Sequence, residues 1–130
     1  MGVRLPSVAT KVIANAAVVT TTELQVVVTP PLNIALDFAQ VLLFWYIALT
    51  VGAGTTAVAA RLRRGVDVTG SQLTTFANVT VAANSALYLN GSYSDIPGAV
   101  AGVQYCVCIL QTGATGNAAI TDVSMIALML

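Results

Sequence analysis

The sequence predicts an all-β protein built as an antiparallel β-sandwich. Turn residues recur at intervals of about 8–12 residues, which is typical of the short strands of sandwiches. The segments between these turns are rich in Val, Thr, Ile and aromatic residues, which favour extended chain, and no segment has a convincing helical period. At 130 residues the chain is long enough to form one domain with a single core.

The first strands are expected at residues 10–19 and 23–29, with a run of threonines between them. Pro30 and Pro31 end the second strand because proline has no backbone N–H to donate. Residues 32–37 then form a short connection. We therefore expect an extended N-terminal arm with the first strands over residues 1–37, and a jelly-roll β-sandwich over residues 38–130.

The segment 38–64 admits two interpretations. As a membrane helix stopped by basic residues it would need about 20 predominantly apolar residues, and the unbroken apolar run 41–49 covers about half of that. As extended chain, residues 41–51 form a strand that is apolar on both faces, and residues 55–64 form an alternating strand. Gly52, Ala53 and Gly54 then form a hairpin turn. The strand interpretation is favoured, and a small membrane protein is the least favoured class.

The second half of the chain continues the pattern of strands and turns. Asp67 and Gly70 mark a turn, with a brief strand at residues 66–69. Strands are predicted at residues 73–83 and 86–90, followed by a loop over residues 91–98. Residues 103–111 form the next strand, residues 112–117 a glycine-rich turn and residues 118–130 the closing strand.

The chain carries few charges for a lone soluble domain. Apolar residues make up 57% and charged residues 8%, the formal net charge is zero and there is no His. Soluble domains average about 45–50% apolar and about 25% charged residues, and near-zero net charge favours association. We therefore expect much of the exterior to be covered by copies of the chain or by a larger shell.

Three predicted strands have no polar face, at residues 41–51, 103–110 and 123–130. The outer face of an antiparallel sandwich normally contacts water, so these strands predict one sheet that is covered on its outside by self-association. The expected subunit-interface residues are Phe44, Tyr46, Tyr105, Val107, Ile109, Met125 and Ala127.

The residue types do not indicate an enzyme. The acidic residues are scattered in or next to turns, and no His is present to act as a base. Cys106 and Cys108 are expected to be small buried hydrophobic residues, about 6.5 Å apart along one strand, with sulfurs that splay outward. No His and no second Cys pair completes a metal ligand set. We therefore expect no metal, no cofactor and no small-molecule substrate.

Arg61, Arg63 and Arg64 form the only concentration of charge. They are expected either to pair with acidic groups of a neighbouring subunit or to keep a solvated strand end from aggregating. Nucleic acid is the least favoured partner, because a net-neutral chain supplies few of the phosphate contacts that such binding requires.

Several stretches resemble a known fold family. The strand QVLLFWYIALTV, the Y-x-V-x-I strand after the Asp-x-Pro-Gly loop, and the terminal SMIALML are similar to the tumour-necrosis-factor/C1q jelly roll. TAVAARLRRGVDVTG, SDIPGAVAGVQYCVCI and TGATGNAAITDVSMIAL are similar to small structural proteins of tailed bacteriophage virions. The resemblance covers residues 38–130 and implies a jelly roll whose inner sheet packs around a threefold axis.

This resemblance implies a non-enzymatic virion protein, a homotrimer that decorates or stabilises the capsid of a tailed phage. Its implied partners are further copies of the chain and the major capsid protein or other virion proteins. The alternative is a tail or fibre tip module that binds a receptor or a carbohydrate. A location in the virion after synthesis in the host cytoplasm is expected, because Pro6 and Ser7 interrupt the apolar core that a signal peptide would need.

Overall fold

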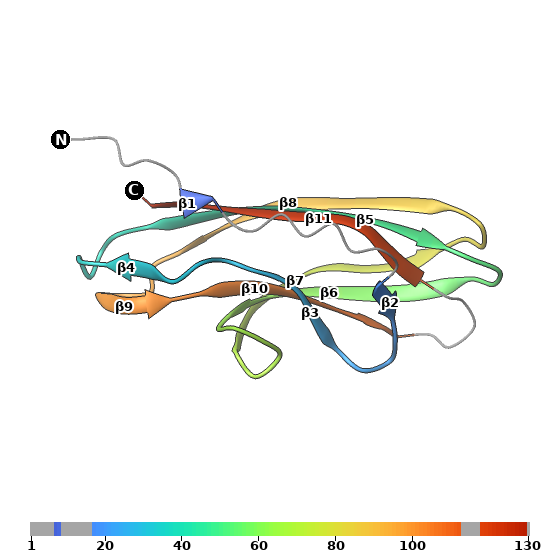
Figure 1. Cartoon of the computed structure of the whole chain (residues 1–130), viewed down its shortest axis with the longest axis horizontal. Helices are drawn as coiled ribbons and strands as arrows, with labels where there is room; N and C mark the ends of the chain where they lie inside the picture. Colours follow the sequence, from blue (N-terminus) through green and yellow to red (C-terminus); the bar gives the residue numbers. More distant parts are fainter. Residues whose placement is uncertain (1–6, 9–16, 113–117, 130) are drawn as a thin grey trace.

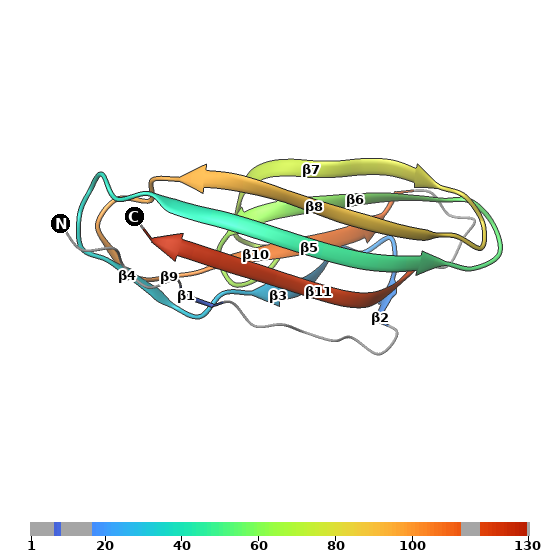
Figure 2. The ribbon, with the colours of Figure 1, turned by 90° about the horizontal axis from the view of Figure 1, so that it is seen from above.

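The structure is an antiparallel β-sandwich, which confirms the predicted fold class. The computed structural model describes residues 7–8, 17–112 and 118–129. Figure 1 shows the two main sheets as layers, and Figure 2 shows one of these layers from above. Every strand pair in the described residues is antiparallel. No helix within the same residues has the length and apolar character needed to cross a membrane.

The larger layer, sheet A, has the strand order β1-β11-β5-β8, and β2 also pairs with β11. Its strands are β1 (Ser7–Val8), β2 (Ala17–Val19), β5 (Val41–Val51), β8 (Ala86–Asp95) and β11 (Ala118–Met129). The second layer, sheet B, has the order β3-β10-β6-β7. Its strands are β3 (Leu24–Val28), β6 (Thr56–Arg64), β7 (Ser71–Val81) and β10 (Tyr105–Gln111). A small sheet C pairs β4 (Leu32–Ile34) with β9 (Val100–Val103).

The alternating side chains of β5 place the core between the layers. Successive side chains of a strand point to opposite faces, and the odd-numbered side chains of β5 all face inward. Each of these is at most 4% exposed: Val41, Leu43, Trp45, Ile47, Leu49 and Val51. Sheet B contributes the other side of the same core, chiefly through Val58, Ala60, Leu62, Tyr105, Val107 and Ile109.

The turn after β5 does not form the predicted hairpin. β5 pairs with β8 and β11 in sheet A, whereas β6 pairs with β7 and β10 in sheet B, so the turn crosses between layers. Gly54 adopts a φ of 91°, which favours glycine. Crossing is favoured because it places the apolar inward faces of β5 and β6 against one another, whereas a hairpin would set them edge to edge in one sheet.

The strand β8 extends through the predicted loop at residues 91–98 as far as Asp95. Gly91 lies opposite Trp45 in the register of β8 and β5. A Cβ atom at Gly91 would lie 2.5 Å from Cζ2 of the Trp45 indole. This glycine is therefore part of a strand and makes room for a buried indole, although its sequence neighbours resemble a loop.

The brief strand predicted at residues 66–69 is absent, and a turn occupies residues 65–70. The Asp67 side chain organises this turn, because its Oδ1 accepts hydrogen bonds from the backbone N–H of Thr69 at 2.8 Å and from its hydroxyl at 2.6 Å. These hydrogen bonds lower the pKa of Asp67.

The described part of residues 1–37 belongs to the sandwich. β1 and β2 pair with β11, β3 pairs with β10, and β4 pairs with β9. Most of the predicted strand at residues 10–19 and of the predicted turn at residues 112–117 lies outside the described residues. The division into an arm and a sandwich domain stays a prediction, as does the jelly-roll connectivity.

We predict that Gly91→Ala destabilises the fold by about 1–3 kcal/mol, because overpacking a filled core forces neighbouring groups apart. The indole beneath it is only 4% exposed and has little room to move. Urea denaturation would measure the free energy of unfolding. Ser92→Ala, at the exposed neighbouring position, is the matched control and should change stability by less than about 0.5 kcal/mol. Equal stability of Gly91→Ala and wild type would contradict this account of the glycine.

Candidate interaction surface

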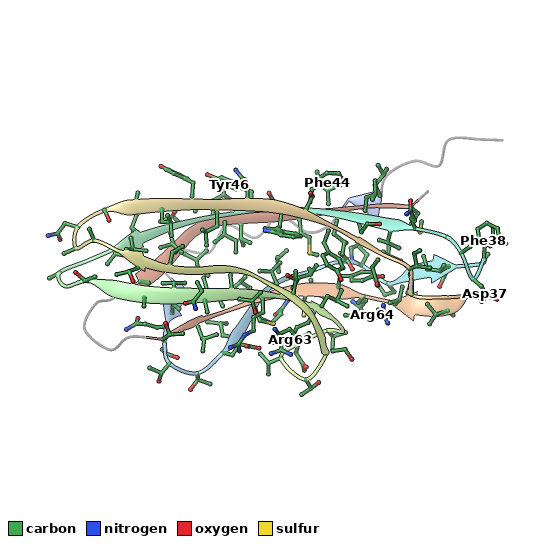
Figure 3. The ribbon with its side chains drawn as sticks, turned by 180° about the vertical axis from the view of Figure 1, so that it is seen from behind. Asp37, Phe38, Phe44, Tyr46, Arg63 and Arg64 are labelled. Carbon is green, nitrogen blue, oxygen red and sulfur yellow. The ribbon has the colours of Figure 1, made fainter. Side chains whose placement is uncertain are left out.

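The outer face of sheet A carries a group of large apolar side chains. We call this group the apolar outer face, and it consists of Leu42, Phe44, Tyr46, Tyr88, Ile126 and Leu128. Phe44 and Ile126 are each 44% exposed and Tyr88 is 64% exposed, while the other three are half-buried. Figure 3 shows Phe44 and Tyr46 pointing away from the sandwich.

Strand register brings these side chains together. Phe44 lies directly opposite Ile126, and Leu42 lies opposite Leu128, in the pairing of β5 with β11. On the other side of β5, the rings of Tyr46 and Tyr88 are stacked with centroids 6.3 Å apart and planes inclined by 17°. Directly opposed residues share one face of a sheet, so the six side chains lie on one surface.

The seven predicted interface residues divide between two environments. Phe44 and Tyr46 lie on the apolar outer face. The others point into the core of the chain itself and are at most 1% exposed: Tyr105, Val107, Ile109, Met125 and Ala127. These five cannot contact another subunit while the sandwich is intact. An acidic substitution among them would unfold the subunit and would not probe an interface.

The three strands that are apolar on both faces were predicted to share one sheet, but they lie in two. β5 and β11 are neighbours in sheet A, whereas β10 lies between β3 and β6 in sheet B. The outward side chains of β10 include Cys106 and Cys108, and both are fully buried. The exposed apolar area is therefore supplied by β5 and β11 together with Tyr88 of β8.

Two of the three clustered arginines share one acidic partner within the chain. Glu23 accepts hydrogen bonds from Arg61 and from Arg63, whose Nε lies 2.8 Å from Glu23 Oε2. Arg63 also donates through Nη1 to the carbonyl oxygen of Gly70 at 2.9 Å. This cluster covers the outside of sheet B near Cys106 and Cys108. The arginines thus already have an acidic partner without a neighbouring subunit, and contacts between this cluster and another molecule stay a prediction.

The third arginine joins the two layers. Arg64 at the end of β6 forms a bidentate ion pair with Asp95 at the end of β8, with distances of 2.9 Å and 2.6 Å. The Tyr105 hydroxyl, from β10, donates to Asp95 Oδ2 at 2.7 Å. The hydrogen bond to Asp95 raises the pKa of Arg64. Burial, followed by the hydrogen bond to Asp95, raises the pKa of Tyr105 above its usual value of 10.0.

Sequence reasoning missed Glu23 and Asp95 as partners of the arginines. Their ion pairs span 40 and 31 residues of sequence, and no local pattern indicates such pairings. Leu42, Ile126, Leu128 and Tyr88 were also not among the predicted interface residues. The alternation with Phe44 and Tyr46 could have indicated Leu42, but the other three required knowledge of which strands are neighbours.

A second apolar surface lies at one end of the sandwich. Phe38 is 74%, Ile96 54% and Leu36 46% exposed, and we call these three residues the apolar end. Asp37 Oδ1 accepts a hydrogen bond from the backbone N–H of Ala99 at 3.1 Å, which joins the turn after β4 to the loop after β8. Figure 3 shows Asp37 and Phe38 at this extremity of the molecule.

Comparison with known proteins identifies the fold but no family. No family model and no curated protein matches the chain. A chain in the structure of the Gx strain of infectious bursal disease virus is 12% identical, with a TM-score of 0.58 over 97% of this chain and 34% of that chain. A chain from the Gt strain is 6% identical, with a TM-score of 0.53 over 92% of this chain and 28% of that chain.

A chain from Bacillus endospore appendages, described as disulfide-linked pili, is 20% identical over 100% of this chain and 95% of that chain, with a TM-score of 0.46. The protein spans about a third of the length of the chain from the Gx strain of the virus. At these identities the likeness to the virus chains is one of fold. Together with the two sheets, it defines the protein as an antiparallel β-sandwich of a kind also present in virus structures.

We predict that Tyr105 makes stability fall at alkaline pH. Below about pH 10 the phenol is protonated in both the folded and the unfolded chain, and its contribution is fully present. As the pH rises further, the unfolded chain releases the proton first, so the free energy of unfolding falls by about 1.4 kcal/mol per pH unit until the raised folded pKa is reached.

Urea denaturation between about pH 9 and about pH 11 would measure this slope. Tyr105→Phe keeps the ring and removes the proton, so its slope should be shallower than that of wild type. Tyr88→Phe changes an exposed tyrosine and serves as the matched control. The hypothesis fails if Tyr105→Phe and wild type lose stability in parallel.

Proposed function

We propose that this protein is a non-enzymatic structural subunit of a virion and that it assembles with copies of itself through the apolar outer face. The observation that carries the proposal is the exposure of Phe44, Tyr88 and Ile126 on one sheet surface. Contiguous apolar patches on soluble proteins commonly mark interaction sites. A second copy is a suitable occupant because the patch is uncharged and the whole chain has a net charge of zero.

Two further observations support a structural role. The fold is shared with parts of chains from virus structures, at TM-scores of 0.58 and 0.53. The arginines that form the densest charge cluster are paired within the chain, with Glu23 and Asp95. An assembly in which uncharged surfaces pack against one another is consistent with this internal use of charge, because it does not bury unpaired ions.

The more specific form of the proposal is a homotrimer that decorates or stabilises the capsid of a tailed phage, with the major capsid protein as a further partner. In this arrangement sheet A faces the threefold axis, as the inner sheet does in the tumour-necrosis-factor/C1q jelly rolls that the sequence resembles. The side chains that would meet at the axis are those of the apolar outer face, because the inward side chains of the same strands form the core.

The double variant Phe44→Asp/Ile126→Asp should dissociate the assembly. Full burial of an apolar side chain of this size stabilises by about 1.5–3 kcal/mol, and directly opposed carboxylates would add repulsion. Light scattering coupled to size-exclusion chromatography would give the mass of each species. We expect a multiple of 13.3 kDa for wild type and 13.3 kDa for the variant.

The matched control for this experiment is Asn78→Asp/Thr80→Asp, which adds the same charges at exposed positions of β7 in sheet B. This variant should keep the mass of wild type. A wild-type protein that stays at 13.3 kDa over the whole accessible concentration range would overturn the proposal. An equal loss of mass in the control would remove the apolar outer face as its cause.

The apolar end favours a second candidate function, that of a tail or fibre tip module that binds a receptor or carbohydrate. Phe38 is the most exposed large apolar side chain of the described residues, at 74%. Its place at the extremity of the sandwich suits a contact with a target beyond the assembly. Aromatic rings at such sites supply contact area with few rotatable bonds.

If this second function applies, Phe38→Ser should abolish binding to a carbohydrate array while leaving the mass of the assembly unchanged. Gln40→Ser, at an exposed position in the same turn, should bind as wild type does. Failure of the wild-type assembly to bind any carbohydrate or any receptor-bearing cell would leave the structural role as the function of the chain.

A further inference from the structure

Two thiols lie side by side under a polar cover on the outside of sheet B. The Sγ atoms of Cys106 and Cys108 are 3.8 Å apart. Both cysteines are free and fully buried. Sulfurs that splay apart along β10 were predicted from the sequence, but the two side chains turn toward one another. The pair is distinct from the apolar outer face, which lies on the other sheet.

The backbone does not favour a disulfide at this place. In an extended strand, the side chains of residues i and i+2 leave the backbone in parallel, so their Cβ atoms lie about 6.6 Å apart. The Cβ atoms of a disulfide lie about 3.8 Å apart. β10 is held extended by its regular pairing with β6 along this stretch, whereas its pairing with β3 has a register shift between Val107 and Cys108. Closing the sulfurs to bonding distance would require the ladder with β6 to buckle.

The same spacing suits two sulfur ligands on one metal ion. Metal–sulfur bonds of about 2.3 Å that meet at about 120°, the angle of a three-coordinate ion, place the sulfurs about 4.0 Å apart, close to the 3.8 Å between the two Sγ atoms. No group of three or more His, Cys, Asp or Glu side chains that could hold a metal occurs in the described residues. The pair therefore suits a soft ion that accepts three ligands, such as Cu(I), better than Zn(II), which usually takes four.

The surroundings favour an anionic sulfur pair. In the pairing of β10 with β6, Cys106 lies opposite Arg63 and Cys108 lies opposite Arg61, so the guanidinium groups share the face of the thiols. Nearby positive charge stabilises a thiolate, which is the form of cysteine that binds a metal ion.

The cover over the thiols consists of side chains and a surface turn. The side chains of Arg61, Arg63 and Glu23 are 30%, 14% and 12% exposed, and the carbonyl oxygen of Asp67 lies 3.5 Å from Cys106 Sγ. An ion can therefore reach the sulfurs when these side chains change rotamer, without separation of the two sheets.

We propose that Cys106 and Cys108 form a binding site for a soft metal ion of low coordination number, with Cu(I) as the representative ion. Binding forms two copper–sulfur bonds and releases the thiol protons to the solvent. Neither copper nor sulfur changes oxidation state in this step. Arg61 and Arg63 balance the negative charge of the resulting bis-thiolate complex.

The experiment is an anaerobic titration of the full chain with Cu(I) in competition with bicinchoninate, followed by X-ray absorption spectroscopy of the loaded protein. We expect one ion per chain, with two sulfur neighbours at about 2.3 Å or slightly less. Cys106→Ala and Cys108→Ala should each weaken binding by about 100-fold or more. Met125→Leu and Met129→Leu remove the other sulfurs of the described residues and should leave the affinity unchanged.

Zn(II) in competition with a chelating dye provides the test of ion type, and it should bind at least about 100-fold more weakly than Cu(I). Circular dichroism of each cysteine variant without metal establishes whether it folds. If a variant does not fold, the absorption spectrum of the loaded wild type decides, because it counts the sulfur neighbours directly. No binding by wild type, unchanged affinity in either cysteine variant, or a single sulfur neighbour would overturn the proposal.

Discussion

The face-to-face packing of sheet A on sheet B is the constraint on which the rest of the structure depends. β5 contributes six inward side chains that are at most 4% exposed, from Val41 to Val51. Their contacts with sheet B require the chain to cross from sheet A to sheet B after β5. The connection between β7 and β8 then crosses back from sheet B to sheet A. These two crossings are hydrogen-bonded to one another, from Asn84 N–H to the Gly52 carbonyl at 2.8 Å and from Val51 N–H to the Ser85 carbonyl at 2.8 Å.

The few charged residues are used mainly inside the chain. Of the five basic and five acidic residues in the sequence, Arg61 and Arg63 pair with Glu23, and Arg64 pairs with Asp95. The Arg64–Asp95 pair lies where the two sheets meet, and Tyr105 completes its hydrogen bonds. Partly buried ion pairs contribute less to net stability than apolar burial does, because the cost of desolvating the two charges offsets their attraction.

Local patterns predicted the strands better than they predicted their neighbours. The bounds of β5, and the use of strands instead of helices in the residues that the structure describes, followed from the β-branched and aromatic runs. The prediction of a hairpin at Gly52 was wrong because a short turn can also connect two different sheets. Only the pairing partners of β5 and β6 show that this turn crosses between sheets. Gly91 was assigned to a loop because its requirement for space comes from Trp45, which is 46 residues away in sequence and directly opposite in the register.

The candidate surface was predicted only in part, because local patterns do not show which strands are neighbours. Phe44 and Tyr46 could be placed on an outer face by alternation, but a strand that is apolar on both faces does not indicate which face is inside. Tyr105, Val107 and Ile109 share a face that alternation correctly grouped, and only the sheet partners show that this face is the core. The sulfur pair depends on side-chain rotamers, which strand spacing alone does not specify.

The two ends of the sandwich differ in chemistry, and this gives the molecule a direction. The turn between β5 and β6 lies at one end of the sandwich, and the turn between β4 and β5 lies at the other (Figure 1). The first turn carries Gly52 and Thr55, whereas the second carries Leu36 and Phe38. A set of subunits joined side by side around a rotation axis would display like ends on like sides. Such a ring would have an apolar rim on one side and a hydrophilic rim on the other, so it could attach to a support in only one orientation.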